Sequence, residues 1–239
     1  MNIGETNPAL EKGFKSAVAD GTTMTIGGTI VKILILLAIV AASFVYSWFY
    51  IPYSAGIMGI VAIGTFIVAM ITSLSPKASQ FTAVIYAAFE GLLLGSISQL
   101  FNARFPGIVL PAIMLTIVAV VVTVTIYGKR PNIAERTRKG VMIALITIVV
   151  TSLIGSVLMW FGITLPIYSN GPIGIIFSLA VVIIATMSLM QDYDFILRGV
   201  QYGAPKYMEW YGAFGLMVTL IWLYMEILQL LAKIFSSND

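Results

Sequence analysis

Apolar residues fill most of the chain and fall into seven long stretches. Each is close to the length of about 20 residues that an α-helix needs to cross a hydrocarbon core of about 30 Å. The predicted spans are 30–50, 55–74, 80–102, 107–127, 141–163, 173–195 and 210–235. Short connections that contain proline separate most of them, as expected where helices begin or end. The pattern predicts an all-α polytopic membrane protein in a lipid bilayer.

The spans divide the chain into three parts. Residues 1–29 form a polar N-terminal segment, residues 30–235 a seven-helix transmembrane domain, and residues 236–239 a short tail. The first part has no basic stretch followed by a short apolar core, so we expect no cleaved signal peptide. The start of the seventh span is ambiguous, because 205–213 mixes charged and aromatic residues as interfacial segments do. We expect 205–213 to be interfacial and about 216–235 to be the spanning helix.

Composition excludes most catalytic chemistry. Hydrophobic residues make up 59% of the chain and charged residues 10%, against roughly 25% charged residues in soluble domains. The chain has no cysteine and no histidine, which removes thiol, serine–histidine and imidazole chemistry. An aspartyl hydrolase is disfavoured because Asp194 has no glycine-rich catalytic motif around it. We expect no enzyme and no cofactor, and any pH response has to come from carboxylates.

The distribution of basic residues predicts the orientation. Seven spans put the termini on opposite sides, with eleven basic residues on the N-terminal side and two on the other. The eleven are Lys12, Lys15, Lys32, Lys77, Lys129, Arg130, Arg136, Arg138, Lys139, Arg198 and Lys206, and the two are Arg104 and Lys233. This asymmetry predicts a cytoplasmic N-terminus and an external C-terminus in the cytoplasmic (inner) membrane. The basic loop 129–139 is then a topology determinant, and we expect no nucleic-acid partner.

Four acids lie inside the predicted spans, namely Glu90, Asp192, Asp194 and Glu226, whereas no lysine or arginine lies deep in any span. A charge in the hydrocarbon costs a few kcal/mol. Each acid therefore needs a proton, a bound cation or a watery cavity. An intramembrane acid of this kind is by default a candidate functional residue.

Glu90 and Glu226 are each predicted to lie about 15 Å deep. Glu90 adjoins a stripe of small residues, Gly91 and Gly95. It is either a protonated acid bonded to a neighbouring helix or part of an ion or proton path. Glu226 has Gln229 one helical turn away on the same face, which favours a functional role.

Asp192 and Asp194 point in different directions, because residues two apart in a helix are about 200° apart. Asp194 shares a face with Gln191 and Arg198, whereas Asp192 shares one with Ser188. An interfacial Asp194–Arg198 pair is one interpretation, although such pairs contribute little. We interpret Asp192 as interfacial.

Several ordered motifs resemble the Bax inhibitor family of membrane proteins, in particular its bacterial branch. They cover nearly the whole chain, and their order and spacing make the resemblance specific. The motifs are Asn7-Pro8-Ala9-Leu10, Met24-Thr25-Ile26-Gly27-Gly28 leading to Lys32, Phe89-Glu90-Gly91 with Gly95, Phe105-Pro106-Gly107-Ile108-Val109-Leu110, Asp192-Tyr193-Asp194, Glu209-Trp210-Tyr211-Gly212-Ala213-Phe214 and Leu223-Tyr224-Met225-Glu226-Ile227-Leu228.

The resemblance implies a fold whose last helix is central, and a pH-sensitive calcium leak channel. Its gate would be an acid pair on helices six and seven that shares a proton or binds a cation, matched here by Asp194 and Glu226. At the seventh-helix position this chain has a glutamate, Glu226, where a characterised relative has aspartate. Relatives also have a basic residue near the inner start of the third helix, which Lys77 loosely matches. Two carboxylates make a weak Ca²⁺ site, with Glu90 lining the path. The pairing requires the later start of the last helix, or a tilted or partly re-entrant last segment.

A second interpretation is a non-transporting regulator. Other bacterial members resemble modulators of a membrane-bound protease, which would then be a partner. The polar N-terminal segment, the basic 129–139 loop and the Gly91–Gly95 stripe support it. The sequence leaves both interpretations open, with the channel favoured by the intramembrane acids.

Overall fold

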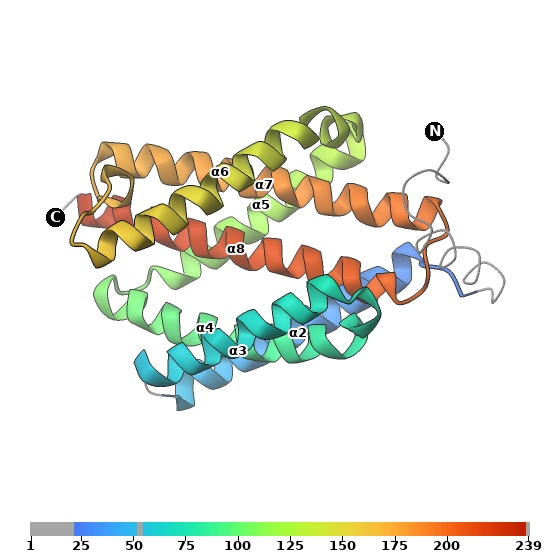
Figure 1. Cartoon of the computed structure of the whole chain (residues 1–239), viewed down its shortest axis with the longest axis horizontal. Coiled ribbons are helices and arrows are strands. Elements are labelled where there is room, and N and C mark those ends of the chain that lie inside the picture. The colour runs from blue at the N-terminus through green and yellow to red at the C-terminus, as the bar shows by residue number, and fades with distance from the viewer. Residues whose placement is uncertain (1–21, 52–54, 238–239) are drawn as a thin grey trace. The chain divides into compact units, whose positions relative to one another are not determined.

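The computed structural model describes residues 22–51 and 55–237 (Figure 1). Within them, seven helices are long and apolar enough to cross a membrane, which confirms the seven-span prediction. They are α2 (Ile26–Tyr50), α3 (Ala55–Leu74), α4 (Ser79–Arg104), α5 (Val109–Lys129), α6 (Asn132–Trp160), α7 (Pro172–Gln201) and α8 (Met208–Ser237). The N-terminal segment up to residue 21, with its Asn7-Pro8-Ala9-Leu10 motif, and residues 238–239 lie outside the described residues.

Proline and glycine mark the connections, as the sequence predicted. Short 3-10 helices, η2 (Pro76–Ala78) and η3 (Pro166–Tyr168), precede α4 and α7. Between α4 and α5, Gly107 has a φ of +84°, a conformation that other residues rarely adopt. The Gly107 backbone N–H donates a hydrogen bond of 2.9 Å to the Asn102 side-chain oxygen. The Phe105-Pro106-Gly107 motif therefore closes a tight turn.

The predicted break near the start of the last helix is wrong. Helix α8 runs unbroken from Met208 to Ser237, through both Gly212 and Gly215. Glycine weakens a helix by only about 1 kcal/mol, which tertiary packing overrides. Gly212 is buried, and a Cβ there would meet Ile196 at 3.0 Å. This glycine permits close helix packing and does not end a helix.

The chain forms two compact units. The first contains residues up to Gln99 together with Phe195–Met217, and the second contains Leu100–Asp194 together with residues from Val218 onward. Helices α4, α7 and α8 each contribute to both units.

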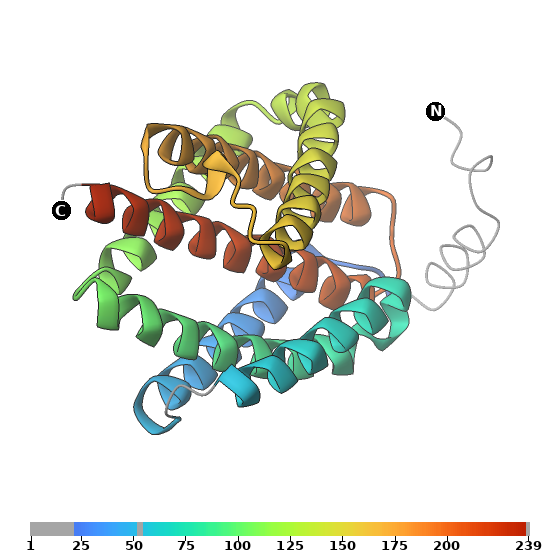
Figure 2. The ribbon, with the colours of Figure 1, turned by 60° about the vertical axis from the view of Figure 1, so that its left-hand side comes forward.

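In the first unit, α2 packs closely on α4 (Figure 2). Gly91 and Gly95 of α4 face the α2 backbone, where a Cβ on Gly95 would lie 2.6 Å from the Phe44 carbonyl oxygen. Ser47 of α2 lies 2.8 Å from both the Leu92 carbonyl oxygen and the Ser96 hydroxyl. The stripe of small residues therefore makes an intramolecular helix contact with polar bonds across it.

We expect Gly95→Ala to destabilise the protein, because the new methyl group cannot fit against a backbone carbonyl. Overpacking of this kind costs about 1–3 kcal/mol. The control is Gly59→Ala in α3, where a Cβ meets nothing within 4 Å and alanine favours the helix. Thermal unfolding in detergent compares the two variants. Equal midpoints would contradict the close α2–α4 contact.

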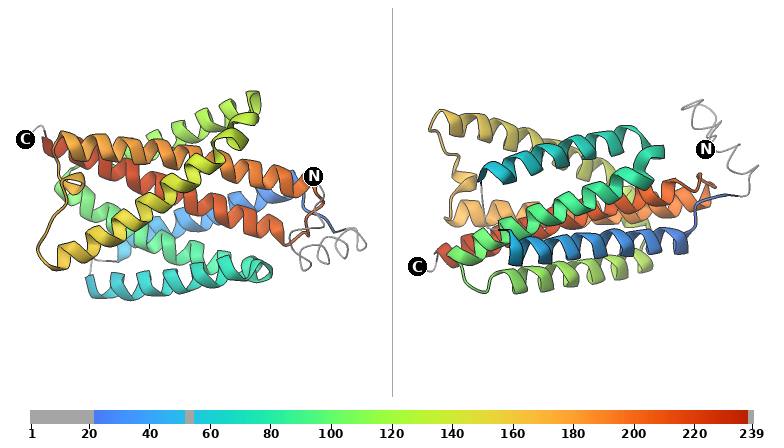
Figure 3. Two further views of the ribbon diagram at one scale, coloured as in Figure 1. Left: turned by 45° about the horizontal axis from the view of Figure 1, so that its top comes forward. Right: turned by 90° about the horizontal axis from the view of Figure 1, so that it is seen from below.

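In the second unit, α7 and α8 run antiparallel side by side (Figure 3). The Lys233 Nζ near the end of α8 donates to the Ser178 hydroxyl near the start of α7, at 2.8 Å. Fourteen residues further along α7 and fourteen back along α8, Thr219 hydrogen-bonds to Asp192. These two contacts fix the register of α8 against α7, and with it the level of every acid on either helix.

Candidate functional site

Asp194 is buried in the second unit, with 8% of its surface exposed. The Tyr127 hydroxyl of α5 lies 3.3 Å from its Oδ1 and donates to it. The Tyr127 ring also packs on Tyr193, with ring centroids 6.1 Å apart. Tyr127 therefore bonds to this buried carboxyl group, and Tyr193 packs against the Tyr127 ring. Arg198 follows one turn later in α7, and the Asp194–Arg198 pair stays a prediction.

Asp192 is half-buried among the helices, and its position at the membrane interface stays a prediction. Helix α7 continues to Gln201, so Asp192 precedes its end by about 13 Å. One carboxylate oxygen receives the Thr219 hydrogen bond. The other, Oδ2, is buried and has no hydrogen-bond partner within the described residues. A buried carboxylate oxygen without a donor calls for a proton, a water molecule or a cation.

Glu226 is half-buried on α8, and the Trp222 indole N–H donates to its Oε1 at 3.0 Å. Lys233 lies two turns further along the same helix, and its charge acts on Glu226. Lys233 is half-buried near the end of α8, where the Ile167 and Gly174 carbonyl oxygens and the Ser178 hydroxyl accept its bonds.

The register of α7 and α8 puts Asp194 and Glu226 at different levels. Glu226 is seven residues beyond Thr219 in α8, and Asp194 is two residues beyond Asp192 in α7, in opposite directions. The two residues are therefore offset by about 13 Å along the helices. Helix α8 has no late start, so direct pairing of Asp194 with Glu226 would need a tilted last segment and stays a prediction. Each acid has its own aromatic hydrogen-bond donor.

The secondary candidates have mainly structural environments. Gln191 donates to the Ala134 carbonyl oxygen at 2.9 Å and lies 3.3 Å from the Thr137 hydroxyl, which ties α7 to the start of α6. Lys77 is exposed on η2, before α4. Gln229 is half-buried on α8 between Glu226 and Lys233. Within the described residues, no three acids gather into a cluster that could hold a metal ion.

Glu90 belongs to the first unit and is half-buried. Tyr86, one turn before it in α4, forms a side-chain hydrogen bond to it. The Tyr86 ring in turn packs edge-on against Phe214, with centroids 5.1 Å apart. This acid is therefore bonded to a tyrosine of its own helix, where the sequence interpretation offered a bond to a neighbouring helix.

Sequence reasoning missed a buried ion pair in the first unit. Glu209, in the first turn of α8, is fully buried, and its Oε2 lies 2.6 Å from the Lys32 ammonium. Its Oε1 accepts bonds of 2.9 Å from both the backbone N–H and the hydroxyl of Thr25. A Cβ on Gly28 would collide with this carboxylate. Thr25, Gly28, Lys32 and Glu209 thus form one cluster, here called the Glu209 cluster.

The Glu209 cluster explains two motifs that are far apart in the sequence. Met24 and Lys206 extend the contact through backbone bonds of 2.7 and 3.1 Å, to Ala204 and Thr22. The segment before α2 is therefore held on the connection between α7 and α8. The occurrence of Gly28 and Lys32 in one motif and Glu209 in another was the available signal. The charged and aromatic residues around Glu209 also fit an interfacial segment, so the sequence alone does not reveal the pairing.

Seven long apolar helices with acids packed among them define a multi-pass helical membrane protein. The chain belongs to the Bax inhibitor 1-like family, whose model matches residues 7–236. Comparisons with curated proteins and with solved structures gave no match.

Proposed function

We propose that this protein is a pH-sensitive cation leak channel of the cytoplasmic membrane, with calcium as the conducted ion. The observation that carries the proposal is the buried Asp192 Oδ2, which has no partner within the described residues. Asp192 bonds to Thr219 of α8 and lies between the levels of Asp194 and Glu226 along the two helices. The second unit therefore has carboxylates at successive levels along α7 and α8, which a passing cation could contact in turn.

The gate acids in this proposal are Asp194 and Glu226, acting at separate levels, and Glu90 of the first unit is a further candidate acid. Hard carboxylate oxygens suit Ca²⁺. Single carboxylates hold it weakly, as conduction requires, because an ion that binds too tightly cannot leave. Protonation removes the negative charge that attracts the cation. Conduction should therefore fall as the pH falls, without any histidine.

The proposed orientation has the N-terminus in the cytoplasm and the C-terminus outside, with α8 as the central helix. The unequal distribution of lysine and arginine between the two sides supports the orientation. The burial of α8 supports its central position. No residue between Tyr207 and Lys233 is exposed. An enclosed helix with Glu226 midway along it is the element on which a conducting path can be built.

We expect calcium to enter liposomes that contain the purified protein faster than empty liposomes, with a rate that increases with pH. The physical reason is the deprotonation of acids that then attract the cation. A calcium-sensitive dye inside the liposomes measures the rate at several pH values. Liposomes with heat-unfolded protein serve as the control. Flux equal to that control at every pH would contradict the proposal.

The alternative is a non-transporting regulator of another membrane protein, such as a membrane protease. The observation that favours it is the exposed basic surface at the start of α6, formed by Arg136, Arg138 and Lys139. The Gly91–Gly95 stripe no longer supports it, because α2 covers those residues. A stoichiometric partner in native membranes, lost when residues 1–20 are deleted, together with absent flux, would favour the regulator.

A further inference from the structure

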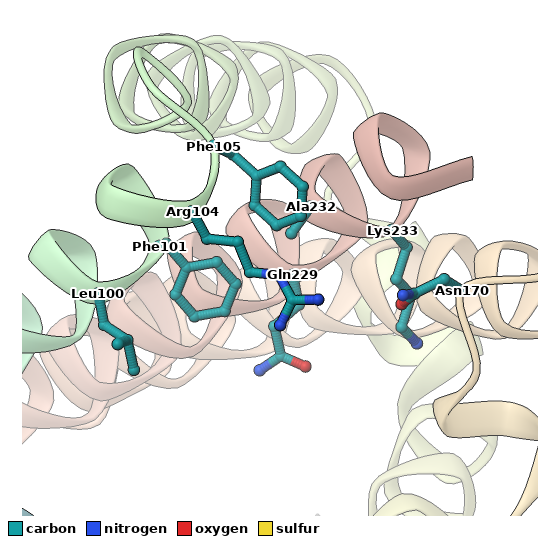
Figure 4. A pocket seen from close by; sticks show the side chains of 8 residues that line it. All are labelled: Leu100, Phe101, Arg104, Phe105, Asn170, Gln229, Ala232 and Lys233. Carbon is teal, nitrogen blue, oxygen red and sulfur yellow. The ribbon is translucent and has the colours of Figure 1, made fainter. Parts of the chain in front are cut away.

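A pocket of about 380 Å³ lies in the second unit, near the ends of α4 and α8. Residues from α4, from the turn after it, from the connection before α7 and from α8 form its wall (Figure 4). The lining residues are Leu100, Phe101, Arg104, Phe105, Asn170, Gln229, Ala232 and Lys233. Two of these are cations and none is an acid. The only two basic residues that the orientation places on the external side thus line the same pocket.

Arg104 and Gln229 have unused donors in this pocket. Figure 4 shows the Arg104 guanidinium extending over Gln229, with Lys233 and Asn170 beyond them. Within the described residues, neither the Arg104 guanidinium nor the Gln229 amide has a hydrogen-bond partner. Phe105 holds the guanidinium by a cation–π contact, with Cζ 5.8 Å from the ring centroid. The donors of both groups are therefore available to a ligand.

Lys233 contributes charge to the pocket but no free donor. Its three N–H groups match three acceptors, the Ile167 and Gly174 carbonyl oxygens and the Ser178 hydroxyl. This fixed ammonium and the Arg104 guanidinium face one cavity without a carboxylate between them. Like charges at such a site repel each other, and the repulsion is relieved when an anion lies between them.

A structural role explains part of this arrangement. Arg104 lies in the last turn of α4, where a cation interacts favourably with the helix dipole. Lys233 also has a structural role, through its three bonds to Ile167, Gly174 and Ser178. These roles do not account for the unpaired Gln229 amide or for the lining of one cavity by both cations without an acid. Together these groups are what a bound anion would require.

We propose that this pocket binds a phosphate group, with Arg104 and Gln229 as donors and Lys233 as a fixed positive charge. Guanidinium groups match phosphate oxygens with two parallel hydrogen bonds. Leu100, Phe101 and Phe105 provide an apolar wall beside these donors, suited to the alkyl part of a phosphate ester. The ligand is either a phospholipid headgroup or a free phosphate, and both share this chemistry.

The test uses the full chain and two probes. In the first arm, the protein is extracted from nanodiscs of phosphatidylglycerol and phosphatidylcholine, and native mass spectrometry counts the retained phosphatidylglycerol. In the second arm, inorganic phosphate is added to the lipid-free protein in detergent, and isothermal titration calorimetry measures its binding affinity. The variant is Arg104→Gln, which we expect to fold because position 104 is exposed. The matched control is Arg136→Gln, an exposed arginine of the same unit outside the pocket.

One retained phosphatidylglycerol, held about tenfold more weakly by Arg104→Gln and unchanged by Arg136→Gln, would identify a lipid headgroup site. The same pattern with inorganic phosphate would identify a free phosphate site. Absence of binding in both arms, or binding that Arg104→Gln leaves unchanged, would overturn the proposal. Neither arm measures calcium flux, so the channel proposal and this one can fail separately.

Discussion

Replacement of Lys32 by methionine is expected to destabilise the protein more than any other single change to the Glu209 cluster. The substitution leaves a carboxylate that is fully buried with no cationic partner in the cluster. Removing one member of a buried ion pair costs about 3–5 kcal/mol, mainly through the uncompensated charge. Denaturation of the purified protein in mixed micelles measures the loss in free energy of unfolding.

The two members of the pair should respond unequally. The Lys32 side chain is 18% exposed, whereas that of Glu209 is 1% exposed. After Glu209→Gln, the stranded ammonium can reach water and the amide can still accept a bond from Thr25. We therefore expect Glu209→Gln to cost less than Lys32→Met. The double variant Lys32→Met/Glu209→Leu should regain much of the lost stability, because no buried charge remains.

Lys77→Met is the matched control, since Lys77 is an exposed lysine of the same unit. Its stability should stay within about 0.5 kcal/mol of the parent protein. If Lys32→Met behaved like Lys77→Met, the Glu209 cluster would not hold the segment before α2 on the connection between α7 and α8.

The spans were predictable because membrane crossing imposes one requirement that composition reveals directly. A stretch of about 20 apolar residues satisfies it, and Pro76 and Pro172 lie where helices begin. Helix ends were harder to predict, because the bilayer does not stop a helix. The charged residues after Asn132 extend α6 beyond the predicted span, and Gly212 does not interrupt α8.

The environment of each acid depends on helix register, which the sequence does not contain. Helical geometry correctly predicted that Asp192 and Asp194 lie on different faces of their helix. The neighbour that each face contacts depends on the register of α8 against α7. The Asp192–Thr219 and Ser178–Lys233 contacts set that register. Glu209 shows the same limit. Its burial follows from packing against Thr25 and Lys32, which lie far away in the chain.

The second large effect is expected from the two proposed gate acids, Asp194 of α7 and Glu226 of α8. Asp194→Asn and Glu226→Gln remove negative charge but keep the size of each side chain. Each amide oxygen can still accept the bond that Tyr127 or Trp222 donates. Folding should therefore survive, while the electrostatic stabilisation of a passing cation is lost. We expect each variant to reduce calcium flux by about tenfold, which corresponds to roughly 1.4 kcal/mol in the barrier.

The pH profile should change together with the rate. At low pH, the wild-type protein is expected to have protonated, uncharged acids and therefore low flux. Asparagine at 194 and glutamine at 226 are uncharged at every pH, so they mimic this protonated state throughout. The double variant should then show low flux that no longer rises with pH. The matched control is Glu135→Gln, which alters an exposed acid in the first turn of α6 in the same unit.

The most direct test of the channel is therefore calcium flux into liposomes, measured across pH for the wild-type protein, Asp194→Asn/Glu226→Gln and Glu135→Gln. The account predicts flux that rises with pH in the wild type and in Glu135→Gln, and a low, flat profile in the double variant. A double variant with the rate and pH profile of the wild type would contradict it.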